Sequence, residues 1–160
     1  MPKQFDTLHS ILQPTCMVQI YEWLVLGFRL AGVGQLMLVI ASLVMPVILK
    51  WREETAKLNS LTRQVFWIYA VYIAATNLWF GLLCLFLPVH LLTQNGLAVA
   101  VTAFMTLYSA GRIAIHFFYF DHNSLPPGWL ARNGGIALLL LYAYLTLLSG
   151  AATLYNMRLI

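Results

Sequence analysis

Residues 64–111, QVFWIYAVYIAATNLWFGLLCLFLPVHLLTQNGLAVAVTAFMTLYSAG, decide the fold because they run for 48 positions without a Lys, Arg, Asp or Glu. The hydrocarbon core of a bilayer is about 30 Å thick, and a helix needs roughly 20 apolar residues to cross it. This stretch is too long for one crossing, and Pro88 and the turn-forming pair Asn95-Gly96 interrupt it near the middle. It therefore predicts two membrane helices joined by a short connection.

The rest of the chain has the same character. Apolar residues make up 61% of it and charged residues only 9%, whereas an average soluble domain is about 25% charged. Two further windows, 30–49 and 133–157, also lack charges. The sequence thus predicts an all-α polytopic membrane protein, a single domain over residues 1–160. Its four transmembrane helices, at 23–49, 64–87, 97–120 and 134–155, are expected to form an antiparallel bundle.

This composition excludes several classes of protein. A soluble enzyme, a secreted disulfide scaffold and a disordered tail all need more polar sequence or more cysteine. The net charge of +4 is not gathered into a patch, which argues against nucleic acid as a partner and leaves the lipid bilayer. The two cysteines, Cys16 and Cys84, are interpreted as buried thiols rather than as a disulfide.

The basic residues predict the orientation. Two of the connections carry most of them, namely Lys50, Arg52, Lys57 and Arg63 in the first and Arg132 in the third. Only Lys3 and Arg158 lie on the other side. Cytoplasmic loops are enriched in Lys and Arg, so both termini are expected on the non-cytoplasmic side of a cell or inner membrane.

The N-terminal segment allows two interpretations. Phe5, Leu8, Ile11 and Leu12 recur at helical spacing, which is typical of a short helix lying in the membrane interface. An irregular tail is the alternative.

The third predicted span carries the strongest polar group of residues. Arg112 lies about 12 Å from the inner end of this span, and its side chain leans deeper into the bilayer. An unpaired charge at such a depth costs about 2.5–3.5 kcal/mol. The polar residues that share its helix face are Tyr108, Ser109, His116 and Tyr119.

Two roles are open for this face. A guanidinium suits the oxygens of a lipid headgroup, a carboxylate or a quinone, and His116 adds a titratable donor. Alternatively, the face is a structural cluster in which tyrosines, backbone carbonyls and Gln35 satisfy Arg112. Asp121 is an unfavourable partner, because nine residues place it about 180° around the helix unless Asp121 or His122 folds back.

The remaining polar residues in the spans are assigned structural roles. Gln35 and Asn77 lie on faces rich in small residues and are expected to hydrogen-bond between helices. Glu22 and Arg29 are expected to form an interfacial pair near the outer surface. On the third span, the face opposite Arg112 is expected to pack against a neighbouring helix; it carries Ala100, Ala103, Ala110 and Ala114.

No motif indicates a cofactor, a metal site or catalytic residues. Bis-histidine haem ligation would need a second histidine inside a span, and His116 has none. The leading hypothesis is a membrane accessory protein or complex subunit whose third span offers its Arg/His/Tyr face to a lipid headgroup, a quinone or a partner helix, including one from a second copy. The alternatives are a small enzyme acting on a lipophilic substrate, with His116 as acid/base and Arg112 as electrostatic clamp, and a carrier of protons or small solutes.

Overall fold

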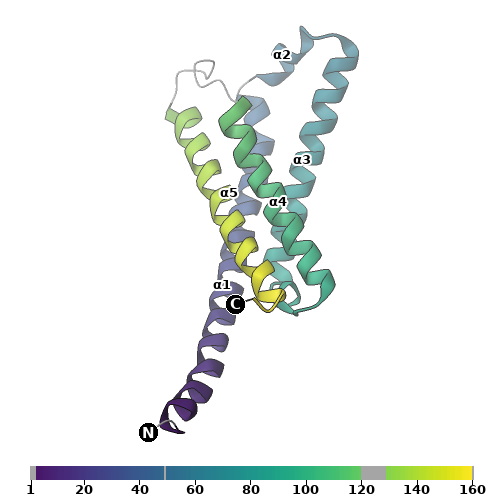
Figure 1. The fold of residues 1–160 in the computed structure, drawn as a ribbon. Coiled ribbons are helices and arrows are strands. Elements are labelled where there is room, and N and C mark those ends of the chain that lie inside the picture. Colours follow the sequence, from purple (N-terminus) through teal and green to yellow (C-terminus); the bar gives the residue numbers. More distant parts are fainter. Residues whose placement is uncertain (1–2, 49, 120–128, 160) are drawn as a thin grey trace.

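The computed structural model describes the backbone of residues 3–48, 50–119 and 129–159, and the side chains of 18–48, 50–118 and 133–159. Within these ranges every regular element is a helix. Four are long, namely α1 (Lys3–Ile48), α3 (Ser60–Phe86), α4 (Gly96–Tyr119) and α5 (Trp129–Asn156). Two are short, the helix α2 (Trp51–Ala56) and the 3-10 turn η1 (His90–Leu92). Figure 1 shows the long helices side by side as a bundle.

Each long helix contains a segment long and apolar enough to cross a membrane: Val18–Ile48, Ser60–Phe86, Gly96–Phe118 and Asn133–Asn156. The predicted all-α, four-span architecture is therefore confirmed. The helix ends differ from the prediction, since α3 begins at Ser60 and α5 at Trp129. Charged residues mark where the hydrocarbon ends, but Arg63 and Arg132 are good helix formers and the helices continue through them.

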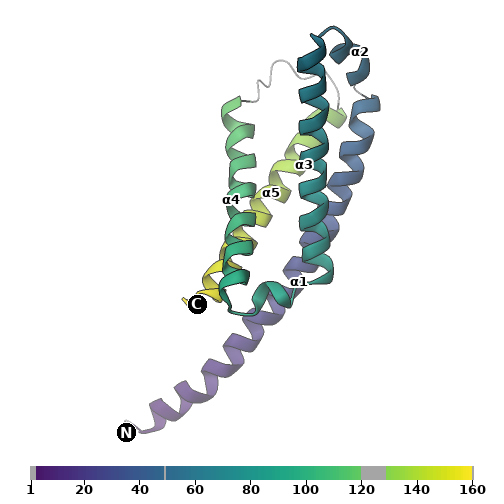
Figure 2. The same ribbon diagram turned by 90° about the vertical axis from the view of Figure 1, so that its right-hand side faces the viewer.

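The N-terminal segment is helical and continuous with the first span. Residue Lys3 already belongs to α1, whose 46 residues correspond to about 69 Å. Figures 1 and 2 show its N-terminal part projecting beyond the rest of the bundle. Neither a separate interfacial helix nor an irregular tail is present over these residues.

The helices pack as two pairs joined through α1 and α5. The pair α1 and α3 crosses at Gly32 and Gly81, where a Cβ on Gly32 would lie 2.9 Å from the Gly81 carbonyl oxygen. The pair α4 and α5 is held by hydroxyl contacts, including Thr106 Oγ1 to Ser149 Oγ at 2.9 Å. Small and hydroxyl-bearing residues allow this close approach, because lipid gives membrane helices no hydrophobic drive to associate.

Close packing is confined to one half of the bundle. In the four long helices, the described residues that are buried lie within 24–35 of α1, 77–84 of α3, 98–109 of α4 and 142–156 of α5. We call this the packed half; it lies toward η1 and the C-terminus. In the open half, toward α2, none of the described residues of the four helices is buried. Figure 1 shows α3 and α4 diverging in that direction.

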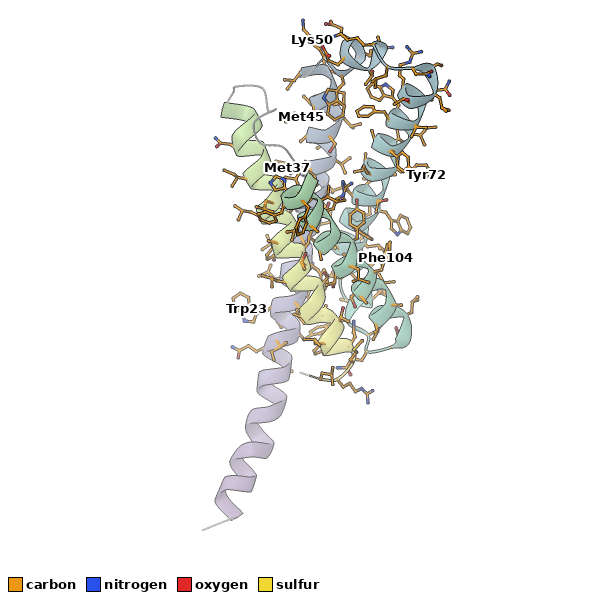
Figure 3. All side chains as sticks on the ribbon, turned by 45° about the horizontal axis from the view of Figure 1, so that its top comes forward. Trp23, Met37, Met45, Lys50, Tyr72 and Phe104 are labelled. Atoms are coloured by element: carbon orange, nitrogen blue, oxygen red, sulfur yellow. The ribbon has the colours of Figure 1, made fainter. Side chains whose placement is uncertain are left out.

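Large apolar side chains cover the outside of the bundle. Trp23, Met37 and Tyr72 are 69%, 66% and 68% exposed, and Figure 3 shows where they lie on α1 and α3. Exposure of this kind is the expected state of surfaces that face lipid tails rather than water.

The prediction that the alanine face of α4 packs against a neighbouring helix is wrong. Ala100 and Ala114 are exposed, while Thr102, Met105 and Ser109 are buried against the neighbouring helices. The buried Thr102 hydroxyl accepts a hydrogen bond from Thr153 of α5 at 3.0 Å, so that face is the more favourable one to remove from lipid. The face that carries Arg112 consequently turns inward.

A methyl group at the α1–α3 crossing should destabilise the protein. In Gly32→Ala, the new Cβ would meet the Leu85 amide nitrogen at 2.8 Å, and backbone cannot move aside as a side-chain tip can. We expect a loss of about 1–3 kcal/mol in the free energy of unfolding, measured on the detergent-solubilised protein. Gly111→Ala is the control, because nothing lies within 4 Å of its Cβ. Equal stability of Gly32→Ala and Gly111→Ala would contradict the described crossing.

Candidate functional site

A layer of polar side chains separates the packed half from the open half. Each long helix contributes to it at the point where its buried residues begin or end: Gln35 is the last buried residue of α1, Asn77 the first of α3, Ser109 the last of α4 and Tyr142 the first of α5. Tyr108 and Arg112 of α4 adjoin these four. We call these six residues the polar layer.

Asn77 connects three helices within this layer. Its Oδ1 accepts a hydrogen bond from the Tyr142 hydroxyl of α5 at 3.1 Å and one from the Tyr108 hydroxyl of α4 at 3.4 Å. Phe80, on α3, packs edge-on against the Tyr108 ring with centroids 5.3 Å apart and helps to fix its position. Asn77 thus makes the interhelical contacts that its position in an apolar helix suggests.

Arg112 extends the network toward the open half. Its Nε and Nη2 donate to the Tyr108 hydroxyl at 3.3 and 3.2 Å, and the guanidinium lies 5.4 Å from the centroid of that ring. Among the described side chains, ion pairs form only near α2, between Lys50 and Glu53 and between Lys57 and Glu54. The described surroundings of Arg112 therefore supply hydrogen bonds but no compensating negative charge.

The other candidates on α4 lie around this charge. Ser109 is buried, and His116 is half-buried, with its Cε1 3.9 Å from where a Cβ of Gly135 on α5 would be. Its ring also packs edge-on against Phe117. Tyr119 ends α4, but its side chain, like Asp121 and His122, lies outside the described residues.

Gln35 is completely buried, yet its amide makes no hydrogen bond to any residue that the structure describes. Neither Nε2 nor Oε1 has a partner there. The side chain starts directly over Gly81, where a Cβ would lie 3.2 Å from the Gln35 Cβ. The structural cluster considered for Arg112 therefore forms through Tyr108 but does not include Gln35.

Glu22 and Arg29 lie apart from the polar layer. Both are exposed on α1, where with Trp23, Val25 and Leu26 they line a shallow surface hollow of about 290 Å³. The expected pair does not form a salt bridge, since among the described side chains the ion pairs within 4 Å are Lys50–Glu53 and Lys57–Glu54. Cys84 is a buried free thiol.

Hydrogen-bond donors outnumber acceptors in the polar layer. Arg112 has five N–H groups, and its described contacts involve only Nε and Nη2, both directed to one hydroxyl. The amide of Gln35 adds two further N–H groups. An excess of donors is complementary to a ligand group that is rich in acceptor oxygens. The described residues contain no group of three or more His, Cys, Asp or Glu that could hold a metal ion.

Comparison of the chain with protein-family models, with curated proteins and with solved structures finds no match. The fold itself defines the class: an all-α integral membrane protein with four helices suited to crossing the bilayer.

Tyr142 was not among the candidate residues, although it is central to the network. A tyrosine in an apolar helix resembles the many aromatic residues that face lipid or the interface. The signal available was its position one turn before Thr146, on the side of α5 that carries Leu145 and Ser149.

The Tyr142–Asn77 hydrogen bond should be measurable as a coupling energy. Asn77→Leu and Tyr142→Phe, made singly and together, should give a non-additive loss of about 0.6–1.7 kcal/mol in unfolding free energy, the range found for hydrogen bonds between membrane helices. Asn77→Leu combined with Tyr144→Phe is the control, because Tyr144 donates to the Gly27 carbonyl instead. A coupling no larger than that of the control pair would show that the bond does not form.

Proposed function

We propose that this chain is a small, non-catalytic integral membrane protein, an accessory or complex subunit, that binds the anionic end of a lipophile at the polar layer. The observation that best supports this proposal is the environment of Arg112. This residue is a cation inside a membrane-spanning helix, and among the described side chains its guanidinium contacts only the neutral Tyr108.

Charge favours an anion over a neutral quinone. A quinone oxygen would accept hydrogen bonds from Arg112 but would leave its charge uncompensated within the bilayer. A carboxylate or phosphate supplies both the acceptor oxygens and the countercharge, and the forked guanidinium matches such groups geometrically. An isolated cation in hydrocarbon costs about 2.5–3.5 kcal/mol. An anion that pairs with Arg112 would relieve this cost, and the gain would contribute to its binding affinity.

The open half suits the apolar part of such a ligand. Leu38, Ile113, Leu138 and Leu141 are partly buried there, beside the cluster formed by Ala31, Tyr142 and Leu145. Arg112 is about 10 Å from the C-terminal end of α4, so the polar end of the ligand would lie deep in the membrane. This depth favours a single-chain amphiphile over a phospholipid whose headgroup stays at the surface.

Loss of the Arg112 charge should weaken binding of an anionic amphiphile. In Arg112→Gln, a polar side chain remains next to Tyr108, but the countercharge for a carboxylate is gone. We expect the affinity for stearate to fall by about tenfold or more, measured by native mass spectrometry of the delipidated protein in a non-ionic detergent. Octadecyl phosphate in a parallel titration distinguishes a phosphate ligand from a carboxylate.

Arg29→Gln is the matched control, because it removes the same charge from an exposed position on α1 and should leave stearate binding unchanged. Equal affinities of Arg112→Gln and the wild-type protein for both amphiphiles would refute the proposal. Turnover of a lipid by the purified chain would also refute it, in favour of an enzyme.

The proposal includes the orientation, with both termini on the non-cytoplasmic side and α2 in the cytoplasm. The basic connection supports it, since the Lys50 and Lys57 side chains are about 70% exposed there. Arg112 then lies nearer the cytoplasmic face, and ligand would be drawn from that leaflet.

Cysteine labelling tests this orientation. A membrane-impermeant maleimide added to intact cells should not label Lys57→Cys, but should label it after permeabilisation. Arg158→Cys, at the exposed C-terminal end, should be labelled in both conditions, with Cys16 and Cys84 replaced by serine throughout. Labelling of Lys57→Cys in intact cells would reverse the orientation.

A further inference from the structure

We infer that Gln35 forms a second, uncharged subsite of the polar layer, which takes a hydroxyl group of a lipophile. The inference deepens the proposed function and rests on it, because it places a further polar group of the ligand beside the one bound by Arg112. It starts from a different residue on a different helix, and so it can fail separately.

The position of Gln35 makes a partner within the protein hard to reach. Its side chain is 0% exposed, and both amide atoms lack a hydrogen bond. The start of the side chain is held over Gly81, one turn from the closely packed Gly32 crossing. Asn77, one turn along the same face of α3, has its Oδ1 occupied by two tyrosine hydroxyls.

The surroundings also exclude bulk water as the ordinary partner. An unsatisfied polar group in the membrane interior costs several kcal/mol, since lipid tails neither donate nor accept hydrogen bonds. A leucine or methionine would fill the same volume without this cost. An amide at this position is therefore stabilised when a polar group is brought to it.

The chemistry of the amide selects the kind of group. Nε2 needs an acceptor and Oε1 needs a donor, and both atoms are without partners. A quinone or ester carbonyl accepts but cannot donate, so it would satisfy only one of them. A hydroxyl does both through one oxygen atom. Gln35 is thus complementary to an alcohol, just as Arg112 is complementary to an anion.

Gln35 also lies at the same boundary as Arg112, and because its amide is fully covered a ligand reaches it only when neighbouring side chains move aside. It is the last buried residue of α1, and the next turn, at Leu38, already belongs to the half-buried lining of the open half. A ligand that enters the open half with its polar end toward the packed half meets Gln35 and Arg112 at the same boundary.

Two neutral probes test the subsite without involving the anion site. Octadecanol can both donate and accept a hydrogen bond, whereas octadecyl methyl ether can only accept. We expect the wild-type protein, in the same detergent titration, to bind octadecanol about tenfold or more tightly than the ether. Gln35→Met, which keeps the length of the side chain, should abolish this preference. Gln64→Met, the same change at an exposed position on α3, should keep it.

Thermal stability without ligand gives an independent readout. Gln35→Met should melt at a higher temperature than the wild-type protein, because it removes a buried amide that the protein itself leaves unpaired. A lower melting temperature would show that the amide has a structural partner and would overturn the inference.

The outcomes separate the two proposals. Equal binding of octadecanol and its ether by the wild-type protein overturns the Gln35 subsite, regardless of the affinity measured for stearate. If the preference for octadecanol depends on Gln35 but the affinity for stearate is unchanged in Arg112→Gln, the subsite is supported and the anion site is overturned.

Discussion

Lipid tails offer no hydrogen-bonding partner, and this constraint governs every polar side chain inside the bundle. A group such as the Asn77 carboxamide must find its partners on other helices, and it does so in the hydroxyls of Tyr108 and Tyr142. Those hydroxyls come from α4 and α5, whereas Asn77 is on α3. The hydrogen bonds of this one side chain therefore hold the two helix pairs in register. The hydrogen bonds are individually worth little in a membrane, about 0.6 kcal/mol on average, so position and not strength is their main contribution.

The polar layer marks a change in how the helices are held together. On one side of it, glycines and hydroxyl residues let backbones approach closely, as at Gly32 and Gly81 or Thr106 and Ser149. On the other side, the described residues of the four helices are nowhere fully buried. The two helix pairs are therefore held together by close contacts in one half and by only partly buried side chains in the other.

The four spans could be predicted from the sequence because charge and length alone define them. Gln35, Asn77 and Arg112 could be identified as candidates because polar and charged residues are rare inside membrane spans. The pairing of α1 with α3 and of α4 with α5 could not, since every span carries a plausible small-residue face. On α4 this ambiguity led to the wrong face: Ala100 and Ala114 are exposed, while Thr102 and Ser109 are buried. Tyr142 was missed because its position one turn before Thr146 is a weak signal, and aromatic residues in apolar helices commonly face lipid or the interface.

Gln35 and Asn77 carry the same functional group and are equally removed from the surface, yet their situations differ. The carboxamide oxygen of Asn77 accepts two hydrogen bonds, whereas that of Gln35 accepts none from the described residues. If both amides served only to hold helices together, an apolar residue of similar size would stabilise the protein more than Gln35 does. The Gln35 amide has a desolvation cost that no hydrogen bond to the described residues offsets. Helix association accounts for Asn77 alone. Among the described side chains, the Arg112 guanidinium likewise contacts only a neutral hydroxyl, so Gln35 and Arg112 both differ from Asn77 in having no described partner that matches their chemistry.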